Sequence, residues 1–311
     1  MVHFSDQGVV IDVTGRPITF RRGIPFLLLV LGLVLVEAIG SRILRYAWDP
    51  GPIVPVVESN ATAAVVSLVI LGLAWFILNH EGVTGTEIGL SSGLILPAIV
   101  AVAGYFLALN VAAAVFAIAS GNPATIGYYW TVSPPEAAVY FLWMLVIAGL
   151  VEEFLFRGYI QTKCIALLGD DHRTRVGLGI VITSLLFSAY HVPRILIDGA
   201  PGGMGPFDYL LLLAINGIAF GLLYEWTHNL YVPILIHAAG NMPGTAGILF
   251  FTTTGWPTWA TIGYAISYLG LIVGMILVYR HWAFTTGWMP VWSERRVARS
   301  PTRSDGNSHR W

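Results

Sequence analysis

Eight long apolar segments run through this 311-residue chain, and they restrict its possible folds more than any other feature. A helix needs about 17–25 mostly apolar residues to cross the hydrocarbon core of a membrane. Inside that core every backbone N–H and C=O must be paired within the protein, which a helix achieves by itself. We therefore predict an all-α fold, a polytopic bundle of about eight transmembrane helices. The predicted spans are Ile24–Gly40, Ala61–Leu78, Leu94–Ala119, Ala137–Phe156, Val176–His191, Tyr209–Trp226, Val232–Phe251 and Trp259–Tyr279.

The composition agrees with lipid as the surrounding solvent. Hydrophobic residues make up 56% of the chain and charged residues 11%, whereas a soluble domain carries about 25% charged residues. The 16 Lys and Arg residues nearly balance the 17 Asp and Glu residues, so no excess of basic residues favours a nucleic acid partner. The one cysteine, Cys164, excludes a disulfide within the chain.

Residues 1–286 are predicted to form one membrane-embedded domain, whose polar motifs lie between residues 137 and 241. Proline- and glycine-rich stretches separate the apolar segments. The first segment lacks the cleavage site of a secretory signal, which favours a retained span. Residues 287–311 are polar and rich in Arg and Ser, so we expect a disordered cytoplasmic tail.

The distribution of Lys and Arg predicts the orientation, because cytoplasmic loops carry an excess of these residues. With eight spans both termini share one side, and that side holds thirteen Lys and Arg residues against three on the other. The thirteen are Arg16, Arg21, Arg22, Arg157, Lys163, Arg173, Arg175, Arg280, Arg295, Arg296, Arg299, Arg303 and Arg310, and the three are Arg42, Arg45 and Arg194. We therefore predict a multi-pass cell-membrane protein with both termini in the cytoplasm.

Three ionisable residues lie within one apolar segment, in the sequence Leu150-Val-Glu-Glu-Phe-Leu-Phe-Arg157. An ionisable side chain inside a span costs about 2.5–3.5 kcal/mol on insertion scales, so such residues point to function. Glu153 and Arg157 are four residues apart and share a helix face, where they can pair. Glu152 is turned by about 100° and is free to point into a cavity. A structural ion pair would explain Glu153 and Arg157 but not Glu152.

Two further polar sites lie in later spans. His191 ends the sequence Phe187-Ser-Ala-Tyr-His, just before a Val-Pro pair that stops the helix. His237 lies near the start of the seventh predicted span, and Asn241 follows one turn later on the same face. Each site alone also has a structural explanation, as a packed, hydrogen-bonded histidine or as a polar contact between helices.

Together the three sites read Glu-Glu-x-x-x-Arg, Phe-x-x-x-His and His-x-x-x-Asn, in this order and on three different spans. This pattern resembles the CAAX prenyl endopeptidase type II family, also called CPBP, the CAAX protease and bacteriocin-processing family of intramembrane proteases. Gly158 and the stretch 229–236 also look like the family. The resemblance implies an endopeptidase that hydrolyses peptide bonds of membrane-associated substrates, with prenylated CAAX-type proteins among the candidates.

The resemblance also implies a role for each motif residue. Glu152 and His191 would activate the attacking water, and His237 and Asn241 would form the oxyanion hole. A donor in such a hole is typically worth about 2.7–4 kcal/mol. Counting residues along each predicted helix places His191 deeper in the membrane than His237. The convergence of the three sites is therefore an implication of the resemblance and not of the spacing.

In the same scheme Glu153 and Arg157 are supporting groups that fix the helix and the local charge, and no metal cofactor is required. A zinc-dependent protease is the main alternative, because two histidines and a glutamate match a known set of zinc ligands. Its ligands would be His191, His237 and one glutamate. The zinc-protease motif His-Glu-x-x-His is absent, since His80-Glu is followed by Gly-Val-Thr.

Two non-enzymatic alternatives remain. A transporter or channel would also carry intramembrane carboxylates, although we find no inverted repeat and no matching pair of broken helices. A scaffold or immunity protein could share the fold without cleaving anything. Sequence alone does not choose among substrates.

Three other features lie in the apolar segments. Gly217/Gly221 and Gly270/Gly274 are GxxxG pairs, which predict close helix contacts and allow a homodimer. Glu37 stands in the first span without a local partner. We predict that its side chain extends towards the membrane interface, and the alternative is that it lines the cavity.

Overall fold

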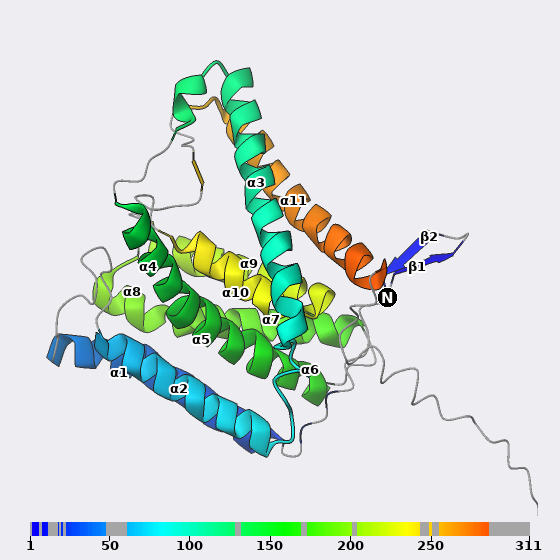
Figure 1. Ribbon diagram of the computed structural model, residues 1–311. Helices are drawn as coiled ribbons and strands as arrows, with labels where there is room; N and C mark the ends of the chain where they lie inside the picture. The colour runs from blue at the N-terminus through cyan, green and yellow to red at the C-terminus, as the bar shows by residue number, and fades with distance from the viewer. Residues whose placement is uncertain are drawn as a thin grey trace, which may run out of the picture.

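The computed structural model describes residues 2–5, 8–11, 18, 20, 23–47, 61–127, 132–168, 173–200, 204–242, 249–250 and 255–285. The predicted tail, 287–311, lies outside this part. The helices form a bundle (Figure 1), which confirms the all-α prediction, and a short antiparallel hairpin precedes them. The elements are β1 (Val2–Ser5), β2 (Gly8–Ile11), α1 (Ile24–Ala47), α2 (Ala61–His80), η1 (Ser92–Leu94), α3 (Ile95–Ala119), η2 (Pro123–Thr125), α4 (Pro134–Met144), η3 (Leu145–Leu150), α5 (Val151–Glu153), η4 (Phe154–Gln161), α6 (Thr162–Leu168), α7 (Arg173–Tyr190), α8 (Val192–Asp198), α9 (Pro206–Thr227), α10 (Tyr231–Gly240) and α11 (Thr258–Thr285).

Within the described ranges, six helical segments are long and apolar enough to cross a membrane. They are Ile24–Leu44, Ser92–Ala119, Pro134–Leu168, Arg173–Asp198, Pro206–Thr227 and Thr258–Trp282. α2 and α10 are shorter apolar helices. Large apolar side chains such as Phe76, Leu107 and Ile118 stay exposed on the outside of the bundle, where lipid would cover them. The chain is a multi-pass membrane protein.

The seventh predicted span, Val232–Phe251, is wrong in its extent. α10 begins at Tyr231 and already ends at Gly240. Ten residues of helix rise only about 15 Å, half of the roughly 30 Å hydrocarbon core. His237 therefore lies in the last turn of a short helix, and not near the start of a long one.

The chain nevertheless crosses the bundle at this point. Asn229, just before α10, donates a hydrogen bond to the Leu94 carbonyl at the beginning of α3, over 2.9 Å. Trp256, just before α11, donates one to the Thr125 hydroxyl beyond the other end of α3, also over 2.9 Å. Asn229 and Trp256 thus lie at opposite ends of the spanning helix α3. The described residues contain six helices that are long enough to span a membrane, so the predicted number of eight is approximate.

The segments α4, η3, α5, η4 and α6 form one continuous rod, the central helix (residues 134–168). Its start is fixed by Ser133, whose backbone N–H and hydroxyl both donate to the Glu136 carboxylate over 2.8 Å. η3 and η4 are wider, π-helical turns on either side of Glu152 and Glu153. π-helical turns inside α-helices occur frequently at functional sites.

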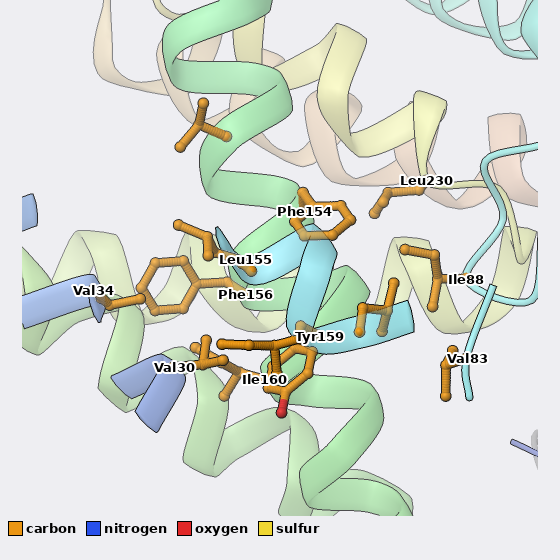
Figure 2. Packing of buried hydrophobic residues seen from close by; sticks show 14 of the residues in the cluster. Val30, Val34, Val83, Ile88, Phe154, Leu155, Phe156, Tyr159, Ile160 and Leu230 are labelled. Atoms are coloured by element: carbon orange, nitrogen blue, oxygen red, sulfur yellow. The ribbon is translucent and has the colours of Figure 1, made fainter. Parts of the chain in front are cut away.

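The hydrophobic core surrounds the C-terminal half of the central helix. Every residue from Phe154 to Gln161 is buried, because α1, α2, α7 and α9 all pack against η4. Figure 2 shows Phe156 beside Val34 of α1 and Phe154 beside Leu230. A helix that is apolar on all sides belongs in the interior of the bundle, so the central helix holds its polar side chains in fixed surroundings.

The two glycine pairs differ in what they contact. A Cβ atom at Gly217 would lie 2.9 Å from the Ser184 Cβ, and one at Gly221 would lie 2.8 Å from Ile180. This pair therefore serves the close packing of α9 on α7 within one molecule. Gly270 and Gly274 of α11 meet nothing within 4 Å, so this pair leaves room for another helix. A homodimer stays a prediction.

Candidate active site

The predicted ion pair of Glu153 and Arg157 is the most deeply buried part of the candidate site. The Arg157 guanidinium donates to Glu153 Oε1 over 3.1 Å, and the two side chains are 0% and 1% exposed for Glu153 and Arg157 respectively. Arg157 also donates to the Gly217 carbonyl over 3.4 Å. Its guanidinium carbon lies 4.6 Å from the centre of the Phe187 ring and 5.4 Å from that of Phe220, within the range of cation–π attraction. The arginine is thus held by the central helix, α7 and α9.

His237 joins this pair from α10. Its Nδ1 lies 2.6 Å from Glu153 Oε1, and its Nε2 lies 3.8 Å from Glu152 Oε2. Phe220 stacks on the imidazole with ring centroids 5.5 Å apart and planes at 17°. One histidine therefore bridges the two adjacent glutamates, and the first and third predicted motifs meet.

Glu152 differs from its neighbour in being only partly buried, with 17% of its side chain exposed. Its Oε2 makes no hydrogen bond to any described residue, and neither does Glu153 Oε2. Buried polar atoms in native proteins nearly always have a partner. Two buried carboxylate oxygens without a described partner at one place therefore make this cluster the candidate functional site.

His191 lies at the junction of α7 and α8, where the chain turns before Pro193. Its Nδ1 lies 2.9 Å from the Phe187 carbonyl. Because a carbonyl only accepts, Nδ1 carries the hydrogen and Nε2 of the neutral ring is an acceptor. The Phe187 ring contacts both histidines, with centroids 5.0 Å from His191 and 6.2 Å from His237. Among the described residues no hydrogen bond or ion pair joins His191 to Glu152 directly, so the second motif meets the others through Phe187.

Asn241 directly follows α10, and its backbone N–H still bonds to the His237 carbonyl over 3.0 Å. Its side chain is exposed, at the open end of the half-length helix. Within the described part of the chain no hydrogen bond joins this side chain to the side chains of Glu152, His191 or His237.

The hydrogen-bond partners of Glu37 were not predicted from the sequence. The predicted extension towards the interface is wrong, because Glu37 is 6% exposed and accepts hydrogen bonds from Ser67, over 3.1 Å, and from Tyr190. Tyr190 is the residue before His191, and the centroids of the two rings lie 4.9 Å apart. The sequence did contain an indication of this contact. A glutamate in an apolar span that has no polar partner nearby in the sequence needs a hydrogen-bond partner on another helix.

In the described part of the chain, no group of three His, Cys, Asp or Glu side chains is arranged to hold a metal ion. His237 Nδ1 is engaged by Glu153, and His191 Nδ1 by a backbone carbonyl. The zinc alternative would need His191 to approach the glutamates from its place on the other side of Phe187.

Residues 134–243 match the family model described as type II CAAX prenyl endopeptidase Rce1-like. The matched segment begins with the central helix and ends just past α10, so it contains Glu152, His191, His237 and Asn241. The family predicted from the three motifs is confirmed for this segment, and the match supports an intramembrane protease of the CAAX type. α1, α2, α3 and α11 lie outside it.

A stretch of 98 residues is 30% identical to the uncharacterized protein YpbD of Bacillus subtilis (strain 168). The match covers 31% of this chain and 39% of that protein, so it spans well under half of either. No solved structure matches the chain.

Proposed function

We propose that the protein is an intramembrane endopeptidase in which Glu152 activates the attacking water. One observation carries the proposal: Glu152 Oε2 is free of hydrogen bonds to described residues and faces His237 Nε2 at 3.8 Å. A water molecule can hydrogen-bond to two polar atoms at such a separation. A carboxylate with one open oxygen, next to a positioned imidazole, is a suitable general base.

The reaction needs one proton to move twice. Glu152 takes a proton from the water while the water oxygen attacks the carbonyl carbon of the scissile peptide bond. Glu152 then gives this proton to the amide nitrogen, the C–N bond breaks, and a new carboxyl terminus and a new amine result. Proton transfer by a positioned side chain typically contributes about 10²–10⁴-fold to the rate.

His237 and Asn241 would hold the oxyanion of the intermediate. Glu153, paired with Arg157, acts as an acceptor, so His237 Nδ1 donates to it. Nε2 then donates to the oxyanion when the ring is protonated, a charge that the two flanking carboxylates stabilise by Coulomb attraction. The exposed Asn241 amide is a second donor of the right chemistry.

His191 would share the water with Glu152. Its Nε2 is the acceptor of the neutral ring, because Nδ1 donates to the Phe187 carbonyl. A peptide entering between α7 and α10 would bring the scissile bond, the water and His191 together. The zinc-dependent alternative would instead use His191 as a metal ligand.

The substrates would be peptides or proteins held at or in the membrane, because the site lies within spanning helices. Prenylated CAAX-type proteins are among the candidates. The Lys and Arg distribution further supports cytoplasmic termini, which a reporter fused after Trp311 would test. Reporter activity on the outer side of the membrane would contradict the proposed orientation.

The experiment that tests the function compares membranes containing the wild-type protein with membranes containing Glu152→Gln. Proteomics of new peptide termini should find cleavage products that appear only with the wild type. Glu87→Gln, in the loop after α2, is the matched control and should give the same products as the wild type. Identical products from all three proteins would favour the scaffold, immunity or transport alternatives.

A further inference from the structure

Glu37 of α1 is a buried acid of a different kind from the others. It accepts hydrogen bonds from the Ser67 hydroxyl of α2, over 3.1 Å, and from the Tyr190 phenol of α7. No Lys or Arg among the described residues lies within ion-pair distance of it, whereas Glu81 and Glu153 each pair with a buried cation. An ionisable residue in a span that lacks a counter-charge is a candidate functional residue.

Tyr190 is held at both ends of its side chain. The hydroxyl donates a hydrogen bond to Glu37. The ring packs against the ring of Phe156 in the central helix, with centroids 5.5 Å apart. The ring also meets the next residue in the chain, His191, edge-on, with centroids 4.9 Å apart and planes at 86°. The position of the Tyr190 ring thus restricts the movement of the His191 imidazole on one side.

The other side of His191 is held by Phe187, through the hydrogen bond from Nδ1 and a ring contact at 5.0 Å. The imidazole therefore contacts two aromatic rings of α7, and each ring is held by a charged group of another helix. The Phe187 ring packs against the Arg157 guanidinium, and the Tyr190 hydroxyl donates to Glu37. The Phe187 ring also contacts His237, whose Nε2 lies 3.8 Å from Glu152 Oε2. The anchored imidazole and the proposed base are thus linked through Phe187 and His237.

We propose that Glu37 and Tyr190 are positioning residues of this site. Glu37, fixed by Ser67, holds the Tyr190 hydroxyl, and the Tyr190 ring holds His191 so that Nε2 can meet the water on Glu152. The proposal rests on the proposed function. It makes α1 and α2, which lie outside the segment 134–243 matched by the family model, part of the catalytic apparatus.

The test uses two near-isosteric variants and a matched control in full-length protein reconstituted in liposomes. Tyr190→Phe removes only the hydroxyl, and Glu37→Gln keeps an oxygen that can accept from it. Tyr159→Phe is the control, because Tyr159 makes the same kind of buried bond, to Glu81, away from the site. The probe is the peptide identified by the new-terminus experiment.

Tyr190→Phe should lower kcat by roughly 10–100-fold, the range expected for misplacement of a catalytic group by up to about 1 Å, with KM changed less than about twofold. Glu37→Leu should have the same effect and Glu37→Gln a much smaller one. The double variant Glu37→Leu/Tyr190→Phe should be no worse than either single change, because both remove one interaction. Tyr159→Phe should keep the kcat of the wild type. Additive losses in the double variant would overturn the proposal.

A second measurement does not depend on activity. In protein labelled with ¹⁵N-histidine, the ring signals of His191 are identified by their loss in His191→Ala. They should shift or broaden in Tyr190→Phe and stay unchanged in Tyr159→Phe. Unchanged His191 signals and wild-type kcat in Tyr190→Phe would refute the positioning role. Shifted signals together with full activity of Glu152→Gln would refute the proposed function and leave the positioning of His191 intact.

Discussion

The central helix carries two buried clusters of charged side chains, and they differ in how completely their atoms are paired. In the lower cluster, Glu81 accepts from Lys163 with one oxygen and from Tyr159 with the other. Lys163 also lies 3.3 Å from the Tyr159 hydroxyl and 4.9 Å from the centre of the Phe20 ring. Each of these polar atoms has a partner within the protein, so this Glu81 cluster is complete by itself.

The upper cluster, made of Glu152, Glu153, Arg157 and His237, is incomplete. One oxygen of each glutamate has no partner among the described residues. Each cluster contains a buried glutamate that is paired with a cation of the central helix, so buried charge alone does not distinguish them. Native proteins break the rules of polar pairing mainly at functional sites. The difference between the proposed catalytic cluster and the structural one is therefore the unpaired oxygen atoms, because both clusters contain buried charge.

The largest effect is expected for Glu152→Gln in the upper cluster. Glutamine keeps the shape but cannot take a proton, so the cleavage rate should fall by roughly 10²–10⁴-fold while the protein stays folded. The matched change Glu81→Gln in the lower cluster should cost stability and leave kcat unchanged. Initial rates with the identified peptide and thermal unfolding curves measure both. Equal losses of activity in the two variants would remove the distinction between the clusters.

Removing a cation should have the next largest effect, and in both clusters. Lys163→Met leaves Glu81 buried and unpaired, which typically costs about 3–5 kcal/mol of stability. Arg157→Ala does the same to Glu153, and it should also lower activity because His237 loses its fixed partner. Unfolding in denaturant and the yield of folded protein measure the loss. A fully stable Arg157→Ala protein would contradict the supporting role of the ion pair.

Sequence could predict the parts of the site that depend on local spacing. Glu153 and Arg157 meet because they are one turn apart, and the apolar runs correctly give the helices. The end of α10 was missed because the apolar residues that resume at 246–251 were joined to it, although Asn-Met-Pro-Gly follows Gly240 directly. The contact between Glu37 and Tyr190 joins residues 153 positions apart, and no periodic pattern reports such a contact. Pairing across a bundle depends on how helices pack, which a single sequence does not specify.

A smaller effect is expected for Asn241→Ala at the open end of α10. Loss of one oxyanion donor should lower kcat by roughly 10²–10³-fold and leave KM nearly unchanged, because the oxyanion exists only after water has attacked. Asn229→Ala is the informative contrast, since this buried amide binds the Leu94 carbonyl and the Tyr279 hydroxyl. It should lower the stability and spare kcat. An Asn241→Ala enzyme with raised KM and normal kcat would assign Asn241 to substrate binding.

The smallest effect, none at all, is expected from a metal chelator. In the metal-free mechanism Glu152 and His191 hold the water themselves, so purified protein should contain far less than one zinc per chain. Its activity should survive prolonged treatment with the chelator. The zinc alternative requires His191, His237 and one glutamate to share an ion, and no described group of three such side chains has that arrangement.

The chelator also sharpens the comparison of the two clusters. A zinc ion bound by Glu152 would give the unpaired oxygen of this residue a partner, and the upper cluster would then be more nearly complete. Its incompleteness would reflect a missing ligand and not a binding place for water. Activity that is lost with chelator and restored by zinc, combined with a near-normal rate for Asn241→Ala, would establish that alternative. Full activity after chelation would support the metal-free mechanism, in which Glu152 takes the proton from water and His191 helps to hold that water.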